Sequence, residues 1–69
     1  MSKRLRETVE QIIVKEGRAG KARICDALNK SERTLDRWIE NGIPTQHDAY
    51  TLALAVGFSE EESLRIARE

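Results

Sequence analysis

Residues 21–40 read KARICDALNKSERTLDRWIE and contain two apolar patterns separated by a short polar segment. Between the two patterns, Asn29 tolerates a left-handed backbone and Ser31 is a favourable N-cap. The spacing predicts a helix from Lys21 to near Asn29, a tight turn, and a second helix running from Ser31 to about Asn41. This prediction depends on apolar residues that recur at the spacing of two short amphipathic helices. They are Ile24, Cys25 and Leu28 in the first helix, and Leu35, Trp38 and Ile39 in the second.

Helices are also predicted on both sides of this stretch. An apolar stripe through Leu5 and Val9 indicates a first helix over Lys3–Glu16, which the Gly17–Gly20 segment ends. After the extended Ile43-Pro44 pair, two further helices are expected, over residues 45–56 and from Ser59 onward. The sequence therefore predicts an all-α fold, a compact bundle of about five short helices.

Length and composition narrow the class of protein. The 69 residues, 39% hydrophobic and 35% charged, allow one globular domain over residues 1–69. The single cysteine excludes an intrachain disulfide, and no Cys/His cluster offers metal ligands, so no cofactor is expected. No apolar run is long enough for a bilayer and no signal-type segment is present, so we expect a cytoplasmic protein with no membrane partner.

Charge is distributed unevenly along the chain although the net charge is zero. Residues 1–23 carry seven basic and three acidic side chains, whereas residues 42–69 carry two basic and five acidic ones. A zero sum argues against a nucleic-acid partner, but a basic front half suits a protein that meets an anion with one face.

The two central helices and their three-residue turn have the arrangement of a helix-turn-helix, in helices 2 and 3 of the expected bundle. Taking Lys21 as the first of twenty positions, the motif requires apolar groups at positions four, eight, fifteen and eighteen, and a small residue at position five. Position nine turns with positive φ and carries Asn29. Lys30 is a departure, because an apolar residue normally packs there and its aliphatic stem must cover the gap. The motif positions are filled by Ile24, Leu28, Leu35 and Trp38, with Cys25 as the small residue.

The stretch resembles the lambda-repressor-like helix-turn-helix superfamily of temperate phage regulators, and within it activators of the lambda CII type. The similarity is carried by residues 28–30 and 35–38, with the Arg37-Trp38 pair followed by Ile43-Pro44. It implies DNA binding by a dimer, as activator or repressor, and contact with RNA polymerase if the protein activates.

The outward face of the helix around residues 31–41 is the expected DNA-reading surface. It carries two columns of like charge at i, i+4 spacing, Glu32-Asp36-Glu40 and Arg33-Arg37. In a helix built only for solubility, positive and negative charges would alternate within each column. Arginine can donate to guanine, and a carboxylate can accept from cytosine. The candidates for base readout are Ser31, Glu32, Arg33, Thr34 and Arg37. The candidates for phosphate contact are Lys21, Arg23, Lys30, Asn41, Thr45 and Gln46.

Other conspicuous residues have structural interpretations. Trp38 is expected to be a core anchor and Cys25 a small buried packing residue. Asp36 and Glu40 are interpreted as tuning and solvation rather than readout. The basic residues at the start of the chain fit either a solvated leader or an arm on the DNA backbone: Lys3, Arg4 and Arg6.

Three function classes compete. The first is a sequence-specific regulator that binds a double-stranded DNA operator as a homodimer or higher homo-oligomer, and is associated with the nucleoid of a bacterial host. The second is a protein-interaction module on the same scaffold, whose acidic back half docks on a basic partner. An enzyme is not expected, because the sequence offers no nucleophile, base or metal to assign. Self-association is expected through the last helix, where Phe58, Leu64 and Ile66 exceed what a small core can cover.

Overall fold

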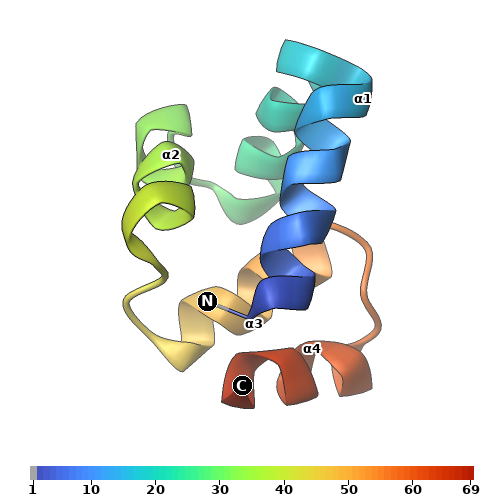
Figure 1. Cartoon of the computed structure of the whole chain (residues 1–69), viewed down its shortest axis with the longest axis vertical. Helices are drawn as coiled ribbons and strands as arrows, with labels where there is room; N and C mark the ends of the chain where they lie inside the picture. Colours follow the sequence, from blue (N-terminus) through green and yellow to red (C-terminus); the bar gives the residue numbers. More distant parts are fainter. Residues whose placement is uncertain (1) are drawn as a thin grey trace.

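The computed structural model describes residues 2–69, and this part of the chain contains helices and no strand (Figure 1). Its Cα radius of gyration is 10.7 Å, close to the value of about 11 Å expected for a compact domain of this length. The all-α prediction is confirmed. The helices are α1 (Lys3–Leu28), α2 (Glu32–Asn41), α3 (Gln46–Ala55) and α4 (Glu60–Arg68).

The described chain has four helices rather than about five, because the first two predicted helices join at Gly17. That residue alone leaves helical geometry, with φ 64° and ψ −140°, inside α1. The expected Gly17–Gly20 break is therefore wrong beyond Gly17, since residues 18–20 already belong to the following helical turn. Figure 1 shows the result as two arms of α1 that run back on each other: the first arm, residues 3–16, and the second arm, residues 18–28.

Gly20 holds the two arms close together. It is buried, and a Cβ built on it would lie 2.7 Å from the Cβ of Glu16 and 3.1 Å from the carbonyl oxygen of Ile12. Such distances are shorter than van der Waals contact, so only glycine fits without a shift of the first arm. Gly20 is thus a packing residue of the second arm and not part of the connecting segment.

Side-chain caps set the helix starts as the sequence predicts. Ser31 Oγ accepts from the backbone N–H of Thr34 at 3.2 Å, and Asn29 before it has a φ of 57°, the left-handed backbone expected there. The two helices expected from residue 45 and from Ser59 also begin at a side-chain cap. Thr45 Oγ1 accepts from the N–H of Asp48, and Ser59 Oγ accepts from the N–H of Glu62.

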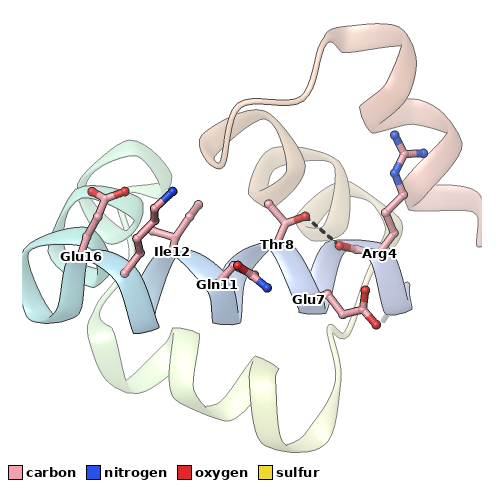
Figure 2. A pocket seen from close by; sticks show the side chains of 7 residues that line it. Arg4, Glu7, Thr8, Gln11, Ile12 and Glu16 are labelled. Carbon is pink, nitrogen blue, oxygen red and sulfur yellow. Dashed lines mark hydrogen bonds between the residues drawn. The ribbon is translucent and has the colours of Figure 1, made fainter.

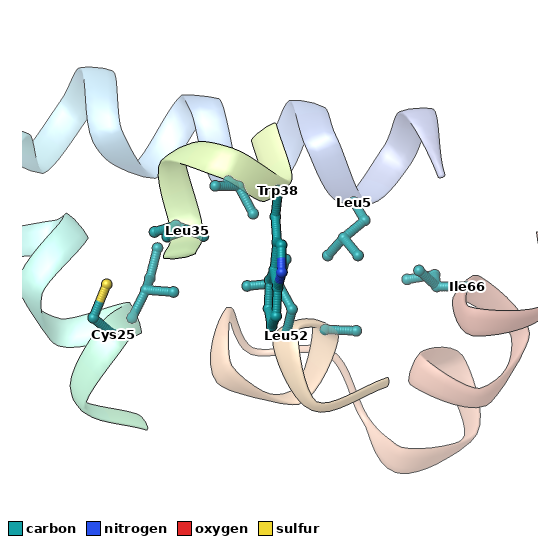
Figure 3. Close-up of a cluster of buried hydrophobic side chains, with 9 residues drawn as sticks. Leu5, Cys25, Leu35, Trp38, Leu52 and Ile66 are labelled. Carbon is teal, nitrogen blue, oxygen red and sulfur yellow. The ribbon is translucent and has the colours of Figure 1, made fainter. Parts of the chain in front are cut away.

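One hydrophobic core joins all four helices (Figure 3). Trp38, 5% exposed, projects from α2 between Leu5 of α1 and Leu52 of α3, which confirms its prediction as a core anchor. α1 packs on α2 and on α3, while α3 packs on α4. The buried apolar residues are Leu5, Val9, Ile24, Cys25, Leu35, Trp38, Leu52, Ala53 and Ile66.

The apolar residues of the C-terminal region divide differently from the expectation. Ile66 is 1% exposed and belongs to the core, and Phe58 packs against that core. The prediction that both are surplus apolar surface is therefore wrong, because the Gly57 turn and α4 bring them under α1. Only Leu64 of the three remains open to solvent, with 48% of its surface exposed.

Two arginines at the start of α1 link helices. Arg4 Nη2 lies 2.8 Å from Glu62 Oε2 of α4, an ion pair without hydrogen-bond geometry, and its guanidinium lies 5.2 Å from the centre of the Phe58 ring. Arg6 Nη2 donates to the carbonyl oxygen of Ile39 at 2.8 Å. That carbonyl is in the last turn of α2, where helices leave acceptors unpaired. Both side chains are about half exposed, and both also link α1 to another helix, which the sequence analysis did not anticipate.

Replacing Gly20 by Ala should destabilise the fold by about 1–2 kcal/mol. The added methyl group overpacks the crossing of the arms, which outweighs the gain of about 1 kcal/mol in helix propensity. Urea denaturation followed by circular dichroism measures the effect. Ala22→Gly, at an exposed site of the same arm, gives the propensity difference alone. A Gly20→Ala protein stabilised by that same amount would contradict the close approach.

Candidate nucleic-acid interface

The solvent-facing side of α2 is set by the two residues that α2 buries. Leu35 and Trp38 point into the core. At 100° per residue, Arg33 lies about 170° from the midpoint between them, so it is close to the point of α2 farthest from the core. Arg37 follows one turn later. Both arginines are exposed, and within residues 2–69 neither takes part in an ion pair.

The acidic column of α2 has a partner inside the chain. Lys21 Nζ of the second arm of α1 lies 2.6 Å from Asp36 Oδ1, and the side chain of Lys21 is only 22% exposed. The hydrogen bond to Asp36 raises the pKa of Lys21, with Glu32 adding to the effect and partial burial opposing it. Two of the three carboxylates in this column therefore act on Lys21.

Arg23, also predicted to contact phosphate, is engaged in the same way. Its Nη2 donates to both carboxylate oxygens of Glu16, at 2.8 and 2.7 Å. This contact joins the two arms of α1 across the Gly17 kink. Arg23 and Lys21 thus each hold a carboxylate already, which partly neutralises the charge that they could offer to a phosphate.

The hydroxyl groups predicted to read bases lie at the start of α2. Ser31 Oγ and Thr34 Oγ1 are 3.1 Å apart and share a hydrogen bond, while Ser31 Oγ also caps the helix. Ser31 is exposed and Thr34 is half-buried. The Ser31 hydroxyl is thus already hydrogen-bonded within the protein. It lies at the same end of α2 as Arg33.

The remaining predicted phosphate contacts lie at the two ends of α2. Lys30, in the turn before α2, is exposed. Asn41 closes the other end of the helix, and Thr45 and Gln46 follow at the start of α3. All four are exposed, and a helix of ten residues separates the two groups by about 15 Å.

The hollow along the first arm of α1 does not have the composition of a catalytic or small-molecule site. This hollow has a volume of about 450 Å³ (Figure 2), and along it Thr8 Oγ1 donates to the carbonyl oxygen of Arg4. Its lining residues come from that arm alone: Arg4, Glu7, Thr8, Gln11, Ile12, Lys15 and Glu16. Ligand sites normally draw polar groups from several elements into one enclosed space. Within residues 2–69, no group of three or more potential metal ligands is assembled.

Cys25 is buried in the core, as predicted. Burial raises the pKa of its thiol, with the charge of Glu32 adding to this effect. A thiol held in its protonated form and away from solvent is a poor nucleophile. Cys25 therefore serves packing between the second arm of α1 and the rest of the core.

The sequence interpretation missed the partner of Asp36. It assigned this residue to tuning and solvation, whereas Asp36 holds Lys21 across the turn between α1 and α2. Helical spacing alone does not pair Lys21 with Asp36, because this contact depends on how the second arm of α1 and α2 lie against each other.

No protein-family model matches this chain, and no curated protein or solved structure is significantly similar to it. None of the helices formed by residues 2–69 is long and apolar enough to cross a membrane.

Replacing Asp36 by Asn should lower the pKa of Lys21, because it removes the main cause of its upward shift. In the wild type, the pair stabilises the fold fully below the usual lysine pKa of about 10.4, and this contribution is lost as pH rises through the raised pKa. Side-chain NMR of Lys21 across alkaline pH measures both proteins. Identical titration curves would contradict the pairing.

Proposed function

We propose that this protein is a sequence-specific double-stranded DNA-binding regulator that reads base edges with the exposed face of α2. The observation that carries the proposal is the state of the two arginines at the centre of that face. Arg33 and Arg37 are exposed, lie one turn apart, and have no ion-pair partner within residues 2–69. Arginine on such a helix can donate two hydrogen bonds to one guanine in the major groove.

The connection between α1 and α2 supports the same proposal. The second arm of α1, the turn through Asn29 with its positive φ, and α2 follow each other as in a helix-turn-helix. In that motif the second helix enters the major groove, which is about 12 Å wide. Lys30 on one side, and Asn41 with Thr45 on the other, then face the two phosphate backbones that border the groove.

The net charge of zero fits this proposal once internal pairing is considered. Arg4, Arg6, Lys21 and Arg23 each have a carboxylate partner within the chain. Lys30 in the turn and Arg33 and Arg37 on α2 are among the basic side chains that this pairing leaves for phosphates and bases. A protein with few free charges binds random DNA weakly, so its affinity depends more on base contacts.

A protein-interaction module remains the second candidate, favoured by the same internal pairing. With most basic side chains of the front half already neutralised, a DNA backbone finds fewer cations than the sequence suggests. Salt dependence separates the two candidates, because DNA binding releases counterions and weakens steeply with added salt.

Replacing Arg33 by Ala should cost about 1–3 kcal/mol of binding free energy on a preferred duplex, and much less on random DNA, because a bidentate guanine contact exists only at the right base. The preferred duplex is obtained by repeated selection from a random pool, and fluorescence anisotropy measures both affinities. Arg37→Ala should act in the same direction but less strongly, because Arg37 lies further from the start of α2 that enters the groove.

The matched control is Lys30→Ala, which removes an exposed charge in the turn. It should weaken binding to both kinds of DNA alike and lower the slope of log affinity against log salt by about one per subunit. Equal losses on preferred and random DNA for both arginine variants would contradict base readout. Failure of the wild type to bind any duplex in a salt-dependent way would contradict the function itself.

Replacing Asp36 by Asn should strengthen binding to random DNA, because it frees Lys21 for a phosphate. The salt slope should then rise by about one per subunit, and the ratio of specific to random affinity should fall. Glu40→Gln removes the same charge from the same helix without releasing a lysine, since within residues 2–69 Glu40 has no ion-pair partner. Equal effects of the two variants would show that Lys21 does not reach the DNA.

A further inference from the structure

The exposed face of α4 has a charge pattern that is complementary to itself. At 100° per residue, its residues 60, 61, 67 and 68 all lie within about 60° of Leu64, so they form one stripe with Leu64 at its centre. Glu60 and Glu61 occupy the N-terminal end of this stripe, and Arg68 occupies the C-terminal end. Reversing the direction of the helix therefore places acid opposite base.

The two ends of the stripe are free to bind something outside the chain. Glu60 and Arg68 are exposed, and neither forms an ion pair within residues 2–69. Glu61 is 81% exposed and makes a 3.3 Å contact with Arg65 on the surface of the same helix. A surface pair of this kind contributes little and can exchange its partner.

Apolar surface lies at the middle of the stripe. Leu64 is 48% exposed, although the rest of the apolar side chains in α4 serve the core or its edge. Beside it runs a shallow groove of about 250 Å³ between α3 and α4. The groove is lined by Gln46, His47, Tyr50, Leu64, Ala67 and Arg68.

We propose that α4 pairs with α4 of a second copy of this chain, antiparallel and with the two-fold axis at Leu64. In this pairing each Leu64 lies against the other copy's stripe and groove, and Glu60 and Glu61 of one copy come level with Arg68 of the other. The same pair of contacts occurs twice, as a two-fold interface requires.

A second copy fits this face better than an unrelated partner does. A stripe with acid at one end, base at the other and an apolar residue midway is matched by its own reverse, and like charges meet in a parallel arrangement. The interface is small, so it implies a weak dimer. It leaves the exposed face of α2 free, and it does not depend on whether the protein binds DNA.

Charge reversal tests the pairing and its direction. Sedimentation equilibrium at chain concentrations up to about 100 µM should show wild-type dimers. Two folded variants, Glu60→Lys/Glu61→Lys and Arg68→Glu, should each associate at least about tenfold more weakly, because like charges then meet at both ends. Mixing the two variants should restore dimers, because each one supplies the charges that the other lacks.

Two further variants make the result decisive. A single chain carrying all three reversals should self-associate like the wild type, since antiparallel pairing again joins opposite charges. Leu64→Asp should yield a monomer with unchanged helical circular dichroism. The proposal is overturned if the wild type is monomeric over this range, if the reversal variants dimerise as well as the wild type, or if folded variants remain monomeric when mixed.

Discussion

Leu35 and Trp38 bury their side chains in the core, and this burial orients the whole of α2. These two side chains fix how α2 is rotated about its own axis against α1 and α3. Once that rotation is fixed, every other residue of α2 has its direction assigned. Arg33 and Arg37 must face solvent, and Asp36 must face the second arm of α1. The proposed DNA-reading surface is thus a consequence of core packing, and the surface cannot change its orientation without disturbing the core.

The ion pairs give the charge of the protein a spatial order that the net value conceals. Carboxylates of α1, α2 and α4 hold Arg4 and Arg6 near the start of α1, and Lys21 and Arg23 in its second arm. What remains unpaired within residues 2–69 includes Lys30 and the arginines of α2. A surface pair contributes little to stability. The main effect of this pairing is therefore to determine which basic side chains stay available to a partner. The acidic column beside the arginines repels phosphate except where a cation intervenes.

The sequence was informative wherever a local rule decides the structure. Caps at Ser31, Thr45 and Ser59, the left-handed Asn29, and the core position of Trp38 all follow from single-residue preferences and helical spacing. Long-range contacts could not be predicted from these local rules. Gly20 looked like part of a loop, because its close approach to Ile12 exists only when the arms fold back on each other.

The same limit applies to the candidate site. The exposed arginines could be predicted from periodicity, because the direction of a side chain on a helix follows from its position relative to the buried stripe. The partners of Lys21 and Arg23 could not be predicted, since those depend on how two helices lie side by side. Phe58 and Ile66 were misjudged for a related reason. Whether an apolar side chain at the end of a small domain is surplus depends on how the last helix docks.

We propose that the exposed face of α2 binds duplex DNA. The most direct measurement is an NMR titration of the ¹⁵N-labelled protein with a duplex selected from a random pool, followed at increasing salt. The account predicts that the largest shifts fall at residues 30–37, with a second group at residues 41–46, and that both fade as salt weakens the complex. Shifts spread over other surfaces while α2 stays unchanged, or no shifts at all, would contradict it.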